Sequence, residues 1–418
     1  MKPCRGKFNS ELVIMLFFLL TPLIEILNSN LLMNFGGDSV LGKIYRFFYI
    51  LAMFVILFKD RFRKKSLNKI IVFISIITFS ATIKGICFNT NFIETFFIGS
   101  KYLLPVMTFI VLEELNNKNK LKNDFFYSVM YKYSIILPFT YILPLILKMG
   151  YYQYSNHIGY KGLNYQINDI NIIFGCTSLF LLYLFIKTKH IKYATLTLLN
   201  VFCLLYMQTK TSIIIVALSL LVSGLQYTKG RNRLIKLVIQ IMVMILIISV
   251  ISTKFQDQII GYFARLNEMY VYMTKQGYSF FEFLTTTRSS RLSQIQYVYD
   301  FDKLSGYLKC LVGLPEKQFL NSEMDFFDIF FRFGIGMLLF ILIFFIRPLI
   351  IAIFNYTYSK DIEDAQLLCI YSVMILFSAF GGHVLMSAYS GAVLALVGYE
   401  IIRRYHFIRI KQGEVKCH

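Results

Sequence analysis

The chain has 418 residues, of which 57% are hydrophobic and only 16% are charged, and its mean hydropathy is +0.60. Soluble proteins carry about a quarter of charged residues, so this composition excludes a disordered chain and argues against a cytosolic enzyme. The formal net charge is +20. Cytoplasmic loops of membrane proteins collect Lys and Arg, which explains the charge without a nucleic-acid partner.

Apolar stretches long enough to cross a bilayer recur along the chain, and a spanning helix needs roughly 20 such residues. They predict an all-α, polytopic integral membrane bundle of about twelve helices. The first stretch follows Lys2, Arg5 and Lys7 without a small-residue cleavage site, which is typical of a retained spanning helix. The predicted spans are 11–29, 43–58, 69–88, 95–113, 125–148, 169–187, 193–208, 211–227, 234–252, 326–357 (kinked at Pro348), 365–384 and 387–402.

Basic residues gather in alternate connections between these spans, around positions 59–69, 118–122, 187–192, 229–236 and 403–416. The positive-inside rule then predicts that all of these connections and both termini face the cytoplasm. The chain divides into three parts: 1–252 with nine spans, a large extracytoplasmic loop at 253–325, and 326–418 with the last three spans and a basic tail. Aromatic residues at 262–283 are typical of a segment at the membrane surface, although an ordinary folded loop explains them equally well.

Cations on the outward side are candidate ligands for an anionic group. Lys210 lies between two apolar runs, in a stretch that a helix start capped by Thr209 or Thr211 explains better when it is taken alone. Arg288 and Arg291 lie three residues apart in the large loop, so they can share one helix face. Guanidinium groups bind phosphate oxygens with two parallel hydrogen bonds, but on composition alone a solvated, charged helix start explains this pair better.

Acidic residues cluster where the span at 326–357 begins. Ser322 and Asp325 resemble a capping box, and carboxylates are favourable at a helix N-terminus. Asp328 and Arg332 have the i,i+4 spacing of an ion pair. Glu323 has no evident partner, so we predict it to be the general base, with Asp325 as the alternative.

Amide and carboxylate side chains before the span at 169–187 could bind sugar hydroxyls. They are Asn164, Asn168 and Asp169, and turn and cap chemistry explains them about as well. A single histidine is more often structural than catalytic, and His383 is given little weight for that reason. The seven cysteines show no metal-binding spacing, and we expect neither a metal nor another cofactor.

Four stretches together resemble the O-antigen ligase and Wzy-type polysaccharide polymerase family. They are GLNYQIND at 162–169, TKTS at 209–212, TRSSRL at 287–292 and the segment 311–340, which contains Gly313 and the Gly334-Ile335-Gly336 run. The resemblance departs from the family pattern at two positions. Lys210 stands where ligases commonly have Arg, and Glu323 stands in place of the catalytic His of ligases, which favours a polymerase.

The resemblance implies a membrane glycosyltransferase that polymerises capsular, exopolysaccharide or O-antigen repeat units. Lys210, Arg288 and Arg291 would hold the pyrophosphate of a polyprenyl-linked oligosaccharide, and Glu323 would deprotonate the acceptor hydroxyl on the outer face of a bacterial cytoplasmic membrane. The reaction would invert the anomeric carbon without a metal, and other polysaccharide-assembly proteins are candidate partners. The alternatives are a ligase with another acceptor and, in a different class, a flippase or transporter of lipid-linked glycans.

Overall fold

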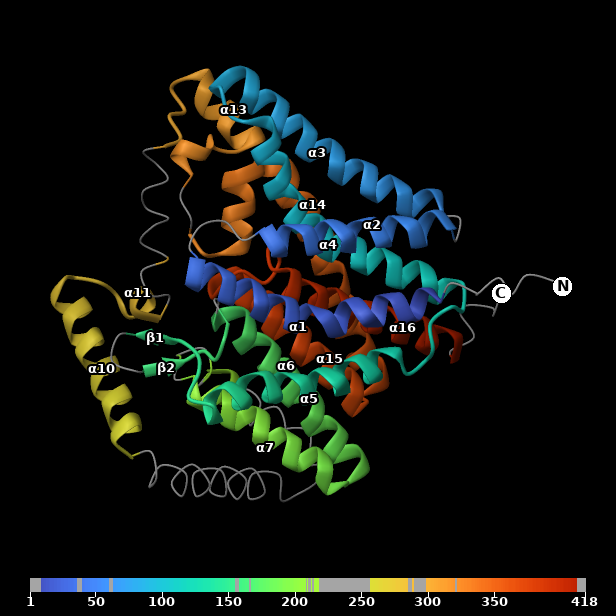
Figure 1. Ribbon diagram of the computed structural model, residues 1–418. Coiled ribbons are helices and arrows are strands. Elements are labelled where there is room, and N and C mark those ends of the chain that lie inside the picture. The colour runs from blue at the N-terminus through green and yellow to red at the C-terminus, as the bar shows by residue number, and fades with distance from the viewer. Residues whose placement is uncertain are drawn as a thin grey trace.

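The computed structural model describes residues 9–35, 40–59, 63–154, 158–164, 167–207, 209, 212, 214–217, 256–284, 288, 298–319 and 322–411. Its main elements are α1 (Ser10–Phe35), α2 (Val40–Lys59), α3 (Lys64–Phe88), α4 (Phe92–Asn117), α5 (Phe125–Ile146), β1 (Tyr152–Tyr154), β2 (Ile158–Tyr160), α6 (Ile167–Thr188), α7 (Ile191–Tyr206), α10 (Gln256–Lys275), α11 (Phe280–Leu284), α13 (Leu304–Val312), α14 (Asp325–Ser359), α15 (Ile362–Phe380) and α16 (Ala388–Lys411). Figure 1 shows a bundle of long helices, with β1 and β2 forming a short antiparallel hairpin at one end.

Eight helices within these ranges are long and apolar enough to cross a bilayer: α1 to α6, α14 and α15. The prediction of a polytopic membrane protein built from helices is therefore confirmed. The count of twelve is not shown. Helix α7 has only 16 residues, and α16 carries charges in its second half, so neither is among the eight. Most of the two spans predicted at 211–227 and 234–252 lies outside the described residues.

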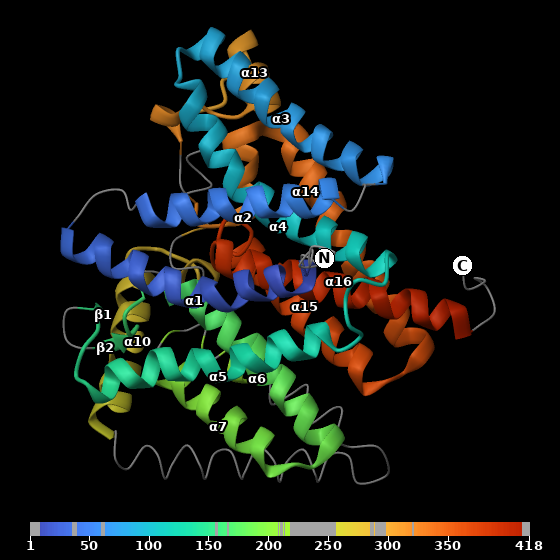
Figure 2. The same cartoon turned by 45° about the vertical axis from the view of Figure 1, so that its right-hand side comes forward.

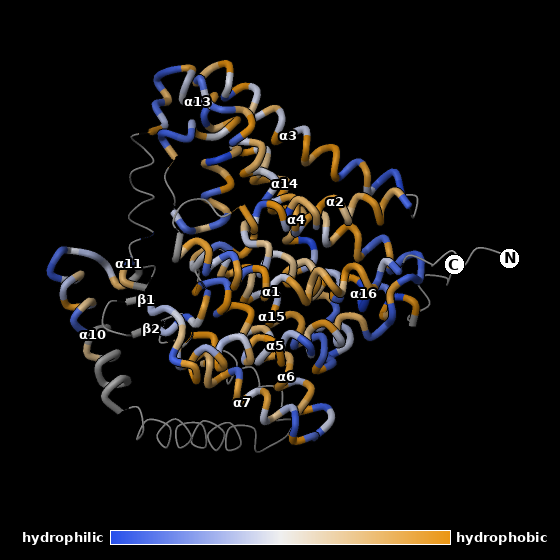
Figure 3. The backbone as a smooth tube through the Cα atoms, in the orientation of Figure 1, coloured by the Kyte–Doolittle hydropathy of each residue, from blue (hydrophilic) through white to orange (hydrophobic). Residues whose placement is uncertain are grey.

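Helices α4 and α6 form the centre of the bundle. In their most apolar 18-residue stretches, 72% and 78% of the residues are buried, against 28% in α1 and α2. The outer helices turn residues such as Leu27, Phe47 and Phe58 outward. Exposed apolar side chains suit lipid contact, since lipid tails are as apolar as these side chains. In Figure 3 the hydrophilic residues gather toward the ends of the long helices, with hydrophobic stretches between them.

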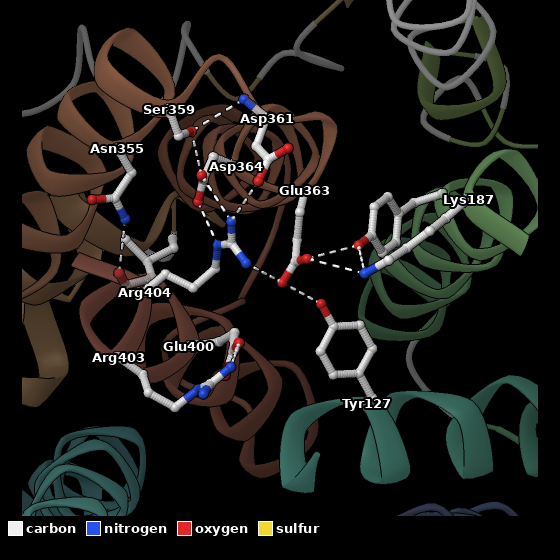
Figure 4. Close-up of polar contacts among 12 residues, drawn as sticks. Tyr127, Lys187, Asn355, Ser359, Asp361, Glu363, Asp364, Glu400, Arg403 and Arg404 are labelled. Atoms are coloured by element: carbon white, nitrogen blue, oxygen red, sulfur yellow. Dashed lines mark hydrogen bonds and ion pairs between the residues drawn. The ribbon is translucent and has the colours of Figure 1, made fainter. Parts of the chain in front are cut away.

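The described connections of the spanning helices fall at two ends of the bundle, as Figures 1 and 2 show. We call the end with the β1–β2 hairpin, α13 and the start of α14 the hairpin end. The opposite end, where α6, α14 and α16 finish, is the basic end. Figure 4 shows its central ion cluster, in which Arg404 of α16 contacts Asp364 and Glu363 at the start of α15, both at 2.5 Å. Glu363 also accepts hydrogen bonds from Tyr127 of α5 and, at 3.3 Å, from Lys187 of α6, so this cluster ties four helices together.

Helix α14 is broken at Gly334, whose φ of 76° and ψ of −171° are not helical. The break frees backbone carbonyls at the bundle interior, and each must find a donor there because an unsatisfied carbonyl is costly in an apolar medium. The amide of Leu314 donates to the Phe331 carbonyl at 2.5 Å. The ammonium of Lys84, a buried residue of α3, donates to the Arg332 carbonyl at 3.0 Å and pairs with Glu316 at 3.4 Å. Residues from α3 and from the segment after α13 therefore stabilise the break.

Two glycines allow the backbone after α13 to lie directly against the break. A methyl group added at Gly334 would come within 2.1 Å of the Leu311 carbonyl oxygen, and one at Gly313 within 2.4 Å of Arg332 backbone atoms. Both residues also have positive φ, which disfavours any other L-amino acid. The closeness of these two backbones explains why this segment needs Gly at both positions.

We expect Gly334→Ala to lower the free energy of unfolding by more than about 1 kcal/mol, because the new methyl group meets backbone in a strained φ region. Gly336→Ala is the matched control, since its nearest neighbour would be an Ile76 methyl group at 3.9 Å. Thermal melting of the purified proteins in detergent measures the difference. Equal melting temperatures for the two variants would contradict this account of the break.

Candidate functional site

The polar groups of the hairpin end converge where α14 begins and where the turn 381–387 joins α15 to α16. Asp325 and Asp328 lie one helical turn apart, so their side chains share a face of α14. Both residues are completely buried. Two carboxylates in such surroundings need hydrogen-bond donors or a cation, because burial of an unpaired charge is very costly.

Asp325 obtains its donors from two other parts of the chain. Its Oδ2 atom accepts hydrogen bonds from the Ser378 hydroxyl at 2.7 Å and from the amides of Val384 and Leu385 at 2.6 and 2.8 Å. These bonds hold the 381–387 turn against α14 and α15. The other oxygen, Oδ1, is buried and has no hydrogen-bond partner among the residues that the structure describes.

Asp328 has a similar asymmetry. Its Oδ1 atom accepts from both the amide and the hydroxyl of Ser322, each at 2.8 Å, so the acid fixes the turn that precedes the helix. Its Oδ2 atom is buried, and no hydrogen-bond partner for it lies in the described part of the chain. The two unbonded oxygens, one from each aspartate, lie 3.6 Å (Asp325) and 3.8 Å (Asp328) from Nδ1 of His383.

His383 therefore lies beside two buried carboxylates, in the turn outside the spanning helices. Burial alone would lower the pKa of the imidazole, but the contact with Asp325, followed by the charges of Asp328 and Asp169, outweighs it and raises the pKa above its ordinary value. The imidazolium form, which compensates nearby negative charge, is thus favoured in this site.

Glu323 and Arg288 form the more exposed part of the site. The Nη2 and Nε atoms of Arg288 donate to Oε2 of Glu323 at 2.7 and 3.1 Å, so Arg288 reaches the turn before α14 from the large loop. Glu323 takes a positive φ of 58°, in the turn that Ser322 and Asp328 hold. The prediction that Glu323 lacks a partner is wrong, since it is paired with Arg288.

Arg332 does not form the predicted ion pair with Asp328. Among the described residues, the charged group within 4.0 Å of Asp328 is His383. The Arg332 guanidinium instead lies over the Phe319 ring, 3.6 Å from its centre. The hydroxyl and amide of Ser322 bind one oxygen of Asp328 from the preceding turn.

The residues predicted to bind glycan lie near the start of α6. Asp169 is buried beside Ser387 and His383, and a methyl group added at Gly382 would lie 3.1 Å from the Asn168 Cβ atom. Both residues therefore lie against the turn that carries His383. Asn164 donates to the Lys161 carbonyl at 3.3 Å, as a turn residue does.

The stretch that contains Lys210 is also joined to α6. Asn171 donates to the Thr209 hydroxyl at 2.8 Å, and Ser212 donates to the Asn171 side chain at 3.0 Å. Lys210 itself and Arg291 lie outside the described residues. Across the part of the chain that the structure covers, no group of three His, Cys, Asp or Glu side chains could hold a metal ion.

His383 is the residue that sequence reasoning undervalued. Its acidic neighbours lie 55 and 58 residues earlier in the chain, so no local spacing pattern reveals them. The Gly381-Gly382 pair before it was the available signal, because two glycines let a turn approach other backbone closely.

We expect His383→Gln to destabilise the protein at pH 6, by about 3–5 kcal/mol, because it removes the cation from a buried charge cluster. The pKa of His383 is higher in the folded protein than in the unfolded chain, where it is about 6.5. The stabilisation by the imidazolium is therefore complete below pH 6.5 and is lost as the pH rises through the folded-state pKa. The gap in melting temperature between wild type and variant should therefore narrow above neutral pH. A gap that stays constant from pH 6 to pH 10 would contradict this linkage.

No family model matches the chain, and no curated protein shows significant similarity to it.

Proposed function

We propose that the protein is a membrane glycosyltransferase that polymerises lipid-linked oligosaccharide repeat units. Two observations support the proposal: the resemblance of four segments to the O-antigen ligase and polysaccharide polymerase family, and the Arg288–Glu323 pair at the hairpin end. The pair carries the most weight, because it joins a candidate phosphate ligand to a candidate base at the entrance of a spanning helix. Ser322 connects it to the buried Asp328 and to His383.

Arg288 would bind the pyrophosphate of the polyprenyl-linked donor, together with Lys210 and Arg291. A guanidinium carries five N–H donors, and the contact with Glu323 engages only Nε and Nη2. Positive charge fixed beside the leaving group stabilises the negative charge that develops as the bond to the sugar breaks.

Glu323 is a better candidate than Asp325 for the base. Its side chain is 35% exposed, whereas Asp325 is fully buried and three donors occupy one of its oxygens. In the proposed step, the acceptor hydroxyl gives its proton to Glu323 and its oxygen attacks the anomeric carbon. The bond from that carbon to the pyrophosphate oxygen breaks, and the electron pair leaves with the pyrophosphate. A single displacement of this kind inverts the anomeric centre.

The proposed orientation places the hairpin end outside a bacterial cytoplasmic membrane. The basic end carries Arg63, Lys118, Lys187 and Arg404, and such cations favour the cytoplasmic side. Twelve spans with both termini inside remain our proposal for the complete topology. No step needs a metal or another cofactor in this mechanism, and other polysaccharide-assembly proteins are candidate partners.

We expect Glu323→Gln and Arg288→Ala to reduce polymerisation by roughly 10²- to 10⁴-fold, the usual contribution of a positioned base or charge. Single repeat units attached to lipid should accumulate in cells that carry either variant, with unchanged protein in the membrane. Asp302→Asn and Lys303→Ala, which alter exposed loop residues, serve as controls. Polymer of normal length from Glu323→Gln would remove this residue from the mechanism.

The products distinguish the alternative functions. A ladder of repeat lengths that disappears on gene deletion supports a polymerase, whereas the loss of one attachment of a finished glycan indicates a ligase. In the deletion strain, single lipid-linked units accumulated on the outer face support glycosyl transfer. Accumulation on the inner face indicates a flippase or transporter.

A further inference from the structure

The His383 ring has one occupied edge and one open edge. Its Nδ1 atom is buried and faces Asp325 and Asp328 at 3.6 and 3.8 Å. The side chain is 15% exposed although Nδ1 is buried, so its accessible part lies away from Nδ1. Within the described residues the Nε2 atom has no hydrogen-bond partner. An imidazolium carries a donor on both nitrogens. This histidine therefore presents an N–H donor away from its carboxylates.

The surroundings of the ring favour a cation at this position. Helix α14 contributes Asp325 and Asp328, and α6 contributes Asp169. Helix α4 contributes the neutral hydroxyl of Tyr102, which interacts electrostatically with Asp325. Helix α15 contributes the Ser378 hydroxyl, which donates to Asp325. The positive charge of Arg332 acts on Asp328. The raised pKa of His383 is the result of this excess of carboxylates.

The carboxylates are themselves held in place, which makes the orientation of the ring specific. Three donors fix Asp325, and two donors from Ser322 fix Asp328. The attraction between these rigid carboxylates and Nδ1 favours a ring orientation that places Nε2 on the opposite edge. Pure charge compensation would need the Nδ1 edge alone and leaves the Nε2 edge without a role.

We propose that His383 is a further substrate-binding residue whose Nε2–H group binds a phosphate oxygen of the lipid-linked donor. The proposal rests on the proposed function. An imidazolium donor forms its strongest hydrogen bonds with anionic oxygens, so a phosphate suits this position better than a neutral sugar hydroxyl. His383 would then complement Arg288, which contacts Glu323 in the turn before α14, the helix whose Asp325 and Asp328 face His383.

The test measures binding of geranylgeranyl pyrophosphate to the full-length protein in phosphatidylcholine nanodiscs, from pH 6 to pH 9. We expect His383→Gln to weaken binding at pH 6 by roughly 10- to 100-fold, as the loss of one charge-assisted hydrogen bond predicts. Wild-type affinity should fall as His383 loses its proton, and the variant should not show this fall. If His383→Gln binds at pH 6 with the affinity of wild type, the proposal is overturned.

Two further variants separate binding from structure. His383→Arg keeps a permanent cation, so it should bind at pH 9 as well as at pH 6, and a pH dependence equal to that of wild type would count against the proposal. Asp328→Asn removes one carboxylate and should move the midpoint of the pH dependence to lower pH. An unmoved midpoint would assign the titration to another group. His190→Gln, at the exposed start of α7, is the matched control.

The same experiment distinguishes the failure of the two proposals. If the wild-type protein does not bind the pyrophosphate at any pH, the proposed function itself is contradicted. If wild type binds it and His383→Gln binds it equally well, only the role of His383 is contradicted. Inorganic pyrophosphate, used as a second probe, should compete weakly if the site takes a lipid-linked donor, and equal affinity would show a site for the free anion instead.

Discussion

The buried carboxylate of Asp325 is the interaction on which the hairpin end depends. In the apolar interior of a membrane protein, an acid can remain only where donors surround it. The three donors that reach Asp325 come from the end of α15 and from the turn that follows it, so one side chain joins the start of α14 to a segment more than 50 residues later in the chain. The placement of His383 follows directly, because the turn that gives its amides to Asp325 also carries this ring.

The break in α14 gives the site a short helix of its own. Gly334 separates the first nine residues from the long apolar part, and Lys84 and Leu314 replace the hydrogen bonds that the break removes. Asp325 and Asp328 therefore sit on a segment held by α3 and by the residues after α13 as well as by its own helix. Rigid support of this kind keeps reactive groups within narrow geometric limits.

Much of the architecture could be predicted from the sequence, because apolar runs and basic connections are local signals. The span predicted at 125–148, for example, corresponds to α5, and the one at 169–187 corresponds to α6. The contacts of the site were harder to predict from the sequence. The approach of Arg288 to Glu323 joins residues 35 apart, and Ser322 rather than Arg332 binds Asp328. Such pairings depend on how turns fold back, and spacing within one helix does not describe them.

Helix α16 has a consequence for assembly of the protein. It is not apolar enough to count as a spanning candidate, yet residues such as Leu394 and Val397 are completely buried, and it packs against the central α4. It also follows the other described helices in chain order. During synthesis, α4 is therefore made long before α16, and the side of α4 that α16 covers lacks this partner until then. Because lipid tails are as apolar as these side chains, lipid covers that side until α16 packs against it.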